Sequence, residues 1–202
     1  MHSQIKIDQL LSDYINYNPG KARKAIELEV WQNFGRKGAI FILDMADFSS
    51  RTKTHGIVYY LSLIKKMQQT VEPIIQNRSG YLVKFVADNV FAFFDTSENA
   101  LQASIDVKVA IDAVNKKNPD DLDILISIGI DYGEFLYLED DHDFFGDPVN
   151  IASKLGEDIA EKGEILMTEN AYHKLPEIPY RSEPTEYKIS DLKIKTYKIL
   201  YP

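Results

Sequence analysis

One apolar segment most constrains what this chain can fold into. Residues 39–43, Ala-Ile-Phe-Ile-Leu, follow Gly38 and are followed at once by Asp44 and by further Asp and Ser residues. A continuous apolar run of this length, bounded by turn-forming residues, is typical of a strand that is buried on both faces. The segment therefore predicts a central strand that carries the carboxylate of Asp44 at its end.

A second pair of apolar segments predicts a hairpin. Residues 81–87 and 90–94 are separated by Asp88 and Asn89, which tolerate the backbone of a tight turn. If the hairpin pairs beside the first strand, Asp44 and Asp88 become neighbours, and two facing carboxylates repel unless a cation lies between them. Carboxylate and phosphate oxygens suit Mg²⁺ or Mn²⁺. Aspartates are also common at strand ends and in turns for purely conformational reasons. The two aspartates therefore fit either a metal-dependent phosphate site or a structural role.

Composition narrows the class of protein. The chain has 202 residues, and 45% hydrophobic with 11% aromatic content excludes a disordered chain and favours one domain plus an appendage. There is no cysteine, no secretory apolar core and no run long enough to span a membrane. We therefore expect a cytoplasmic protein without membrane insertion. A net charge of -8 argues against binding to nucleic acid, which needs clustered cations.

The order of the expected elements indicates the fold. Residues 1–36 predict an N-terminal extension of two helices, which would cover the core, mediate dimerisation or receive a signal. Helices are expected over residues 54–76 and, capped by Ser97, 97–116; strands are expected at 122–130 and, as its hairpin partner, 135–138. The resulting βαββαβ order predicts a ferredoxin-like α+β fold over residues 37–202, with an antiparallel sheet covered by helices.

A polar pattern follows the last of these strands. The segment 143–157 enters a helix around Pro148, and residues four apart share one helix face, so Asn150 and Lys154 point the same way. An amide and an ammonium near a helix start can bind a ribose or phosphate oxygen. The same pattern also fits an ordinary solvated face.

Taken together, residues 37–200 resemble the catalytic domain of the class III nucleotidyl cyclases, the adenylate and guanylate cyclases. The likeness rests on four segments in matching order: residues 41–49, 84–88, 128–133 and 146–155. The resemblance implies that Asp44 and Asp88 bind two divalent ions, Mg²⁺ or Mn²⁺, with the backbone carbonyl of Met45 as a further ligand. It also implies that Lys84 and Asp143 select adenine, so that ATP is the substrate and cyclic AMP the product.

The remaining site residues match the family pattern to different degrees. Asn150 matches the residue that orients the ribose, and Lys193 is a weak match to a late lysine that contacts phosphate, for which Lys188 or Lys195 could serve instead. Lys154 stands where the family has its transition-state arginine. Lysine keeps the charge but lacks the rigid guanidinium fork, so we expect weak activity. Ala87 stands where the family usually has glycine.

The resemblance further implies a homodimer in which each active site takes residues from both protomers. A second hypothesis is a cyclase-like regulatory dimer that binds ATP with negligible turnover, as Lys154 suggests. A polymerase-like palm is less favoured because the hairpin lacks its Gly-Gly-acidic turn, and no P-loop pattern is present. The sequence identifies no upstream sensor or regulator.

Overall fold

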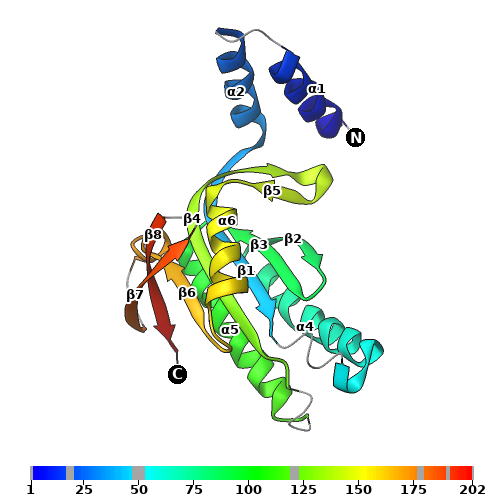
Figure 1. The fold of residues 1–202 in the computed structure, drawn as a ribbon, viewed down its shortest axis with the longest axis vertical. Helices are drawn as coiled ribbons and strands as arrows, with labels where there is room; N and C mark the ends of the chain where they lie inside the picture. The colour runs from blue at the N-terminus through cyan, green and yellow to red at the C-terminus, as the bar shows by residue number, and fades with distance from the viewer. Residues whose placement is uncertain are drawn as a thin grey trace.

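The computed structural model describes residues 2–16, 21–46, 53–118, 123–176, 180–189 and 192–201 (Figure 1). In chain order the elements are α1 (His2–Asn16), α2 (Lys21–Phe34), β1 (Gly35–Met45), α4 (Ile57–Asn77), β2 (Gly80–Val86), β3 (Asn89–Phe94), α5 (Ser97–Asn115), β4 (Ile126–Leu138), the 3₁₀ turn η2 (Glu139–Asp141), β5 (Asp143–Phe145), α6 (Asp147–Ser153), the π-helical segment η3 (Lys154–Ile159), β6 (Ile165–Thr168), α7 (Glu169–Tyr172), β7 (Arg181–Ile189) and β8 (Leu192–Leu200).

The strands form one sheet in the order β2-β3-β1-β4-β6-β8-β7, with β5 paired to β4 beside this path. β1 is antiparallel to both of its neighbours, β3 and β4, so the strand that ends near Asp44 lies inside the sheet as predicted. The order β1, α4, β2, β3, α5, β4 confirms the ferredoxin-like α+β class. However, β4 and β6 run parallel, so the sheet is mixed rather than wholly antiparallel.

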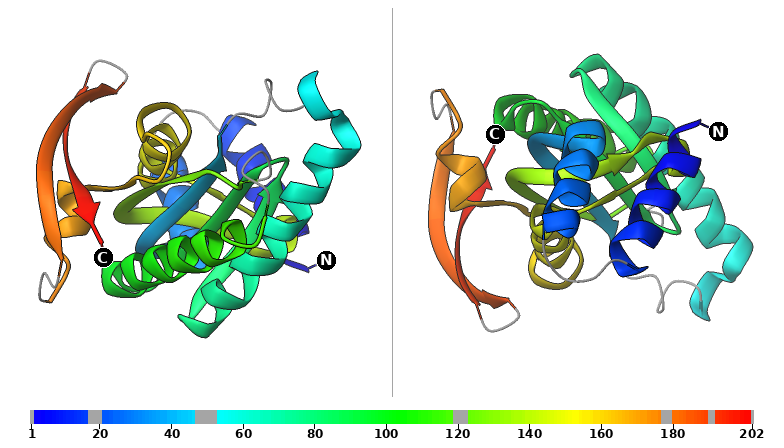
Figure 2. Two further views of the ribbon diagram at one scale, coloured as in Figure 1. Left: turned by 90° about the horizontal axis from the view of Figure 1, so that it is seen from below. Right: turned by 90° about the horizontal axis from the view of Figure 1, so that it is seen from above.

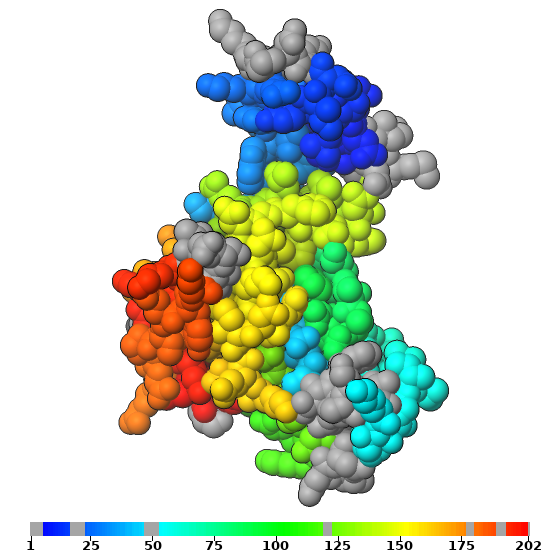
Figure 3. Space-filling view, in the orientation of Figure 1, coloured from blue at the N-terminus to red at the C-terminus, as the bar shows by residue number. Residues whose placement is uncertain are grey.

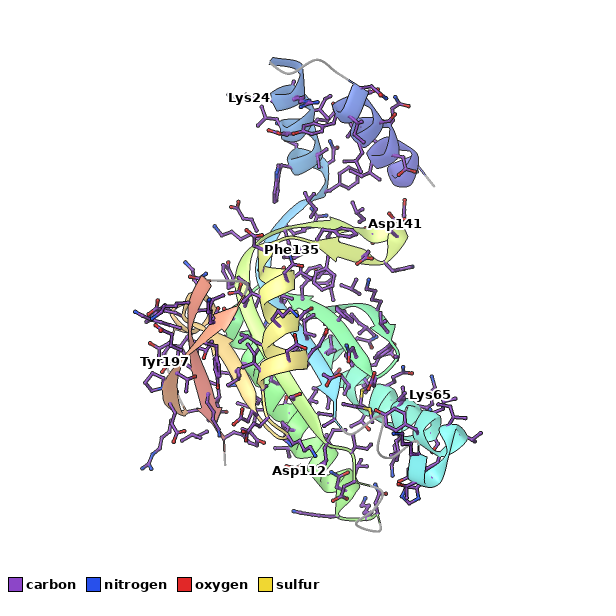
Figure 4. All side chains as sticks on the ribbon, viewed as in Figure 1. Lys24, Lys65, Asp112, Phe135, Asp141 and Tyr197 are labelled. Atoms are coloured by element: carbon purple, nitrogen blue, oxygen red, sulfur yellow. The ribbon has the colours of Figure 1, made fainter. Side chains whose placement is uncertain are left out.

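Side chains alternate along β1 between two cores. Phe41 and Leu43 pack in the core beneath α4 and α5, whereas Ile40 and Ile42 pack with Phe135 on the side that carries α6. Figure 2 shows α4 and α5 on one side of the sheet and α6 on the other, and Figure 4 labels Phe135. Because both faces of β1 are covered, the strand needs an apolar residue at nearly every position, which explains the unbroken apolar run.

β4 is one continuous strand, and the predicted division into two strands at 122–130 and 135–138 is wrong. Both halves pair with β1, from Ile126 opposite Met45 to Leu136 opposite Gly35. The hairpin partner of β4 is instead the short strand β5. Gly133 lies inside β4, where an added Cβ would come within 3.1 Å of the Pro148 ring. This glycine is therefore explained by the close approach of α6 rather than by a turn.

The β2–β3 turn lies one residue earlier than predicted. Val86 pairs with Asn89, so the turn residues are Ala87 and Asp88 rather than Asp88 and Asn89. Ala87 has a φ of 51°, in the left-handed region where a Cβ atom is unfavourable. The turn thus holds Asp88 at its tip and strains Ala87.

The helix boundaries differ from the predictions by one to three residues. Thr96, not Ser97, is the N-cap of α5, because its hydroxyl accepts a hydrogen bond from the backbone N–H of Asn99 at 3.2 Å. α4 begins at Ile57 after a short helical stretch at 53–55, and it ends beside Gly80, as expected.

The two predicted N-terminal helices are present and pack on each other. Ile7 and Leu10 of α1 form a small core with Val30 and Phe34 of α2, and this core also contacts Leu136 of β4. In Figure 1 the helix pair lies beyond the β4–β5 hairpin. The division into an extension at 1–36 and a catalytic domain at 37–202 stays a prediction. None of the helices in the described ranges is long and apolar enough to cross a membrane.

Candidate active site

Lys84 and Asp143, which the sequence places 59 positions apart, form an ion pair of 2.7 Å between β2 and β5. Each side chain is about 30% exposed, so the pair is accessible from solvent. The Lys84 ammonium lies 5.5 Å from the centre of the Phe91 ring, and the Asp143 carboxylate also accepts the backbone N–H of Phe144 at 2.8 Å. The fold therefore fixes a donor and an acceptor side by side.

The two aspartates of the predicted metal site lie within electrostatic reach of each other. Burial, followed by the negative charges of Asp88, Glu157 and Asp158, raises the pKa of Asp44 to about 7. Asp88 accepts a hydrogen bond of 2.9 Å from the hydroxyl of Tyr60, a fully buried residue of α4. The site is thus strongly negative, as a cation-binding site would be without its cation.

The π-helical segment explains why Glu157 and Asp158 lie near Asp44. Gly156 packs tightly on the sheet: an added Cβ there would lie 2.8 Å from the Ile42 carbonyl oxygen. The Ser127 hydroxyl donates to the Gly156 carbonyl at 2.8 Å. Neither acidic residue was predicted to lie at the site, although two consecutive acidic residues directly after Gly156 are visible in the sequence.

A cavity of about 500 Å³ opens beside Asp44, and Ser127, Glu157 and Lys162 are among its other lining residues. In the part of the chain that the structure describes, no group of three His, Asp or Glu side chains is placed to hold a metal ion together. A cation at Asp44 and Asp88 would therefore need neutral oxygen ligands, for which the predicted Met45 carbonyl is suited in kind.

Asn150 and Lys154 are both exposed on the outer side of the helical stretch formed by α6 and η3. Figure 3 shows this stretch in yellow on the surface between β2–β3 and β7–β8. The Lys154 ammonium lies 2.6 Å from the carboxylate of Asp158. The predicted face thus exists, but its lysine is already paired with an acid.

Lys193 lies apart from these residues, on β8. Its ammonium forms an exposed ion pair of 3.1 Å with Glu186 of β7, and Lys188 lies opposite it in the β7–β8 ladder. Lys195 forms an ion pair of 3.4 Å with Glu169. The structure therefore places all three candidate lysines on one hairpin and does not bring them to Asp44.

A larger cavity of about 840 Å³ lies between α2, α6 and α7, and its lining includes Trp31, Tyr132 and the buried Asp131. Asp131 accepts a hydrogen bond from Thr168, which in turn caps α7. None of the predicted site residues lines this cavity. We therefore place the candidate active site at the Asp44 corner and along α6, not at the larger cavity.

The fold is that of the adenylate and guanylate cyclase catalytic domains. Residues 32–200 match the family described as the adenylate and guanylate cyclase catalytic domain, so the chain belongs to this family. A solved adenylate/guanylate cyclase/hydrolase from Silicibacter pomeroyi is 27% identical with a TM-score of 0.73, over 83% of this chain and 98% of that one. An adenylyl cyclase from P. aeruginosa, 19% identical with a TM-score of 0.69 over 83% and 95%, shares the fold.

Curated relatives are longer than this chain. A putative adenylate cyclase of Rhizobium meliloti is 25% identical over 137 residues, which cover 68% of this chain and 23% of the relative. An uncharacterised protein of Mycobacterium tuberculosis is 27% identical over 136 residues, which cover 67% of this chain and 34% of the relative. The matched region thus spans about a quarter to a third of the length of these relatives.

Proposed function

We propose that the chain is an adenylate cyclase that converts ATP to 3′,5′-cyclic AMP and pyrophosphate. The Lys84–Asp143 ion pair carries this proposal, because it sets a donor and an acceptor side by side at an accessible position. The ammonium can donate to N1 of adenine, and the carboxylate can accept from the exocyclic amine. Guanine presents the opposite pattern at these edges, so the pair favours ATP over GTP.

Asp44 and Asp88 are the proposed ligands of two divalent ions, Mg²⁺ or Mn²⁺, with the Met45 carbonyl as a further ligand. The raised pKa of Asp44, which follows from its burial and from the neighbouring carboxylates, supports a cation at this position. When bound, such ions would activate the ribose 3′-hydroxyl and neutralise the α-phosphate. The chain itself holds the two carboxylates in place: β1 fixes Asp44, and the Tyr60 hydroxyl fixes Asp88.

The remaining residues are proposed to orient the ribose and the phosphates. Asn150 can hydrogen-bond the ribose, and Lys154 can place positive charge on the reacting phosphate. Lys193 is the proposed contact of the outer phosphates, with Lys188 and Lys195 as alternatives on the same hairpin. The reaction needs no covalent nucleophile from the protein, because the ribose hydroxyl of the substrate attacks the phosphate of the same molecule.

We propose that the active unit is a homodimer in which Asp44 and Asp88 of one protomer face Lys84, Asp143 and Asn150 of the other. Three large apolar residues at the start of α4 support an interface there, because they are at least half exposed: Ile57, Val58 and Leu61.

Complementation tests this arrangement. Asp44→Ala is expected to be inactive, and Lys84→Ala is expected to keep about a tenth of the wild-type activity or less. An equal mixture of the two should recover about a quarter of the wild-type activity, since half of the dimers then contain one intact site. A mixture that remains inactive, although the two variants exchange protomers, would exclude shared sites.

A second candidate function is a cyclase-like regulatory dimer that binds ATP with negligible turnover. The 2.6 Å pair between Lys154 and Asp158 favours it, because the one charge expected to stabilise the transition state is already engaged. Both functions predict binding of ATP, so product formation has to decide between them.

The deciding experiment is the formation of cyclic AMP from ATP and of cyclic GMP from GTP, with Mn²⁺ or Mg²⁺. Cyclic AMP that is lost in Asp44→Ala would support the adenylate cyclase. ATP binding without either product would support the regulatory dimer, and cyclic GMP as the main product would overturn the assignment of ATP.

A further inference from the structure

The side-chain oxygen of Asn89 is shielded from solvent and has no hydrogen-bond partner among the described residues. Such a group is unusual, because an unpaired buried acceptor loses its bonds to water without replacement. The hydroxyl oxygen of Ser97, in the first turn of α5, is a second buried oxygen without a partner. The position of Asn89, unlike that of Ser97, offers an explanation.

Asn89 lies beside Asp44 in the sheet. The β1–β3 pairing ends at Leu43 opposite Val90, and the same antiparallel register continued by one residue would bring Asp44 opposite Asn89. Residues in such pairs project from the same face, with Cβ atoms about 5 Å apart. Leu43 and Val90 face the core under α4 and α5, and Asp44 and Asn89 therefore face the opposite side, which carries α6.

The surroundings of Asn89 are strongly negative. Asp88 precedes it in the chain, and the charges of Asp88 and Glu157 both act on Asp44. An unpaired oxygen next to carboxylates is unfavourable unless a cation lies between them. Asp44 and Glu157 also line a cavity, which leaves space on one side of the Asp44 carboxylate.

The available ligands also point to Asn89. Within the described ranges no third acidic or histidine side chain is placed to complete a metal group. Mg²⁺ and Mn²⁺ accept neutral oxygens, and the side-chain carbonyl of asparagine is a common hard ligand. The side chain of Asn89 thus offers a neutral oxygen near Asp44 and Asp88, and this oxygen has no hydrogen-bond partner in the described part of the chain.

We propose that the side-chain oxygen of Asn89 is a further ligand, direct or through one water molecule, of a divalent cation held between Asp44 and Asp88. This inference rests on the proposed function, which assigns Asp44, Asp88 and the Met45 carbonyl to the metal. It adds Asn89 to the proposed metal ligands and explains why its oxygen is buried without a partner among the described residues.

The test is Mn²⁺ binding to the full chain without nucleotide, measured by the loss of the free Mn²⁺ signal in electron paramagnetic resonance. Asn89→Leu should weaken Mn²⁺ binding by about tenfold or more, as expected for a lost ligand or ligand-supporting group. Asn89→Asp keeps an oxygen and should bind Mn²⁺ at least as tightly as the wild type. In metal-free buffer Asn89→Leu should unfold at the same or a higher temperature, because it removes an unpaired buried oxygen.

Ser97→Ala is the matched control, because it removes the other buried oxygen without a partner, and it should leave Mn²⁺ affinity unchanged. Equal Mn²⁺ affinity of Asn89→Leu and the wild type would overturn the inference, as would a wild type that binds no Mn²⁺. Asp44→Asn separates the two levels of proposal. If it loses Mn²⁺ binding and cyclic AMP formation while Asn89→Leu keeps both, the proposed function stands and the role of Asn89 fails.

Discussion

The ammonium of Lys154 lies 2.6 Å from the carboxylate of Asp158, and both side chains are more than half exposed. The pair is formed within the π-helical segment Lys154–Ile159, and the same carboxylate contributes to the raised pKa of Asp44. A phosphate group that binds Lys154 must therefore compete with Asp158 for the ammonium. The identity of residue 154 and its pairing with Asp158 should both influence the reaction.

Lys154→Arg is expected to raise kcat for cyclic AMP formation by about tenfold to a hundredfold, because a guanidinium offers a rigid fork to phosphate oxygens. Steady-state rates at saturating ATP and Mn²⁺ measure the effect. Lys65→Arg, an exposed change on α4 (labelled in Figure 4), is the control and should have no effect. A kcat that is unchanged or lower in Lys154→Arg would contradict a phosphate contact at residue 154.

The Lys84–Asp143 pair should determine the choice of base. Lys84→Glu/Asp143→Ser offers an acceptor to N1–H and a donor to O6 of guanine, so kcat/KM for ATP should fall by about ten- to a hundredfold, the effect of losing a hydrogen bond to a charged group. The ratio of GTP to ATP turnover should rise correspondingly. The charge-matched control is Lys37→Glu/Glu134→Ser, which alters an exposed ion pair of 3.6 Å between β1 and β4. An equal loss in both double variants would exclude base recognition.

Asp44 should make the metal-free protein less stable as the pH rises. Its pKa is raised from 3.8 to about 7 by burial and then by Asp88, so between these values the folded state binds more protons than the unfolded state. Stability from this group is therefore present at low pH and lost as the pH rises through about 7. Burial also raises the pKa of Asp131, which acts with the same sign.

Thermal unfolding at about pH 5 and about pH 8 checks this expectation, because the titration of Asp44 spans that interval. The difference between the two pH values should be smaller in Asp44→Asn than in the wild type, which isolates Asp44 from Asp131. Saturating Mn²⁺ at the higher pH should restore the stability of the wild type but not that of Asp44→Asn. A pH dependence that is the same in both proteins would contradict the raised pKa.

Ala87→Gly should stabilise the protein by about 1 kcal/mol, because Ala87 has a φ of 51° and glycine carries no Cβ to strain this backbone. Chemical denaturation measures the change. Ala110→Gly, inside α5, is the comparison and should destabilise the protein by about the same amount. If both substitutions destabilise equally, strain at Ala87 is not significant.

Local patterns in the sequence were sufficient for most of the fold. The apolar run 39–43 predicted a strand buried on both faces, and β1 is such a strand. Periodicity located α1, α2 and α4, whereas α5 was predicted from a cap residue. The errors arose where local signals mislead: strands were predicted at 122–130 and 135–138, although β4 is continuous and Gly133 within it permits Pro148 of α6 to pack closely. Asp88 and Asn89 suggested a turn by residue type, although the strand register shifts the turn to Ala87 and Asp88.

The surroundings of the candidate site were less predictable. The order of the motifs identified Asp44, Asp88, Lys84 and Asp143 as candidate site residues. No sequence pattern predicted the hydrogen bond from the buried Tyr60 hydroxyl to Asp88, or the buried Asn89 oxygen that lacks a partner among the described residues. These features depend on contacts between elements far apart in the chain, which periodicity and residue type do not encode.

The sequence by itself determined the order of elements from β1 to β4, the family and the types of polar residue near the site, because these follow from apolar runs, periodicity and motif spacing. The tertiary structure decided which of those residues meet. The pairing of β1 with β3 places Asn89 beside Asp44, and the π-helical segment, packed through Gly156 against β1, brings Glu157 and Asp158 to the same corner. Strand register and helix packing fix such contacts, since each is a compromise among many side chains across the sheet.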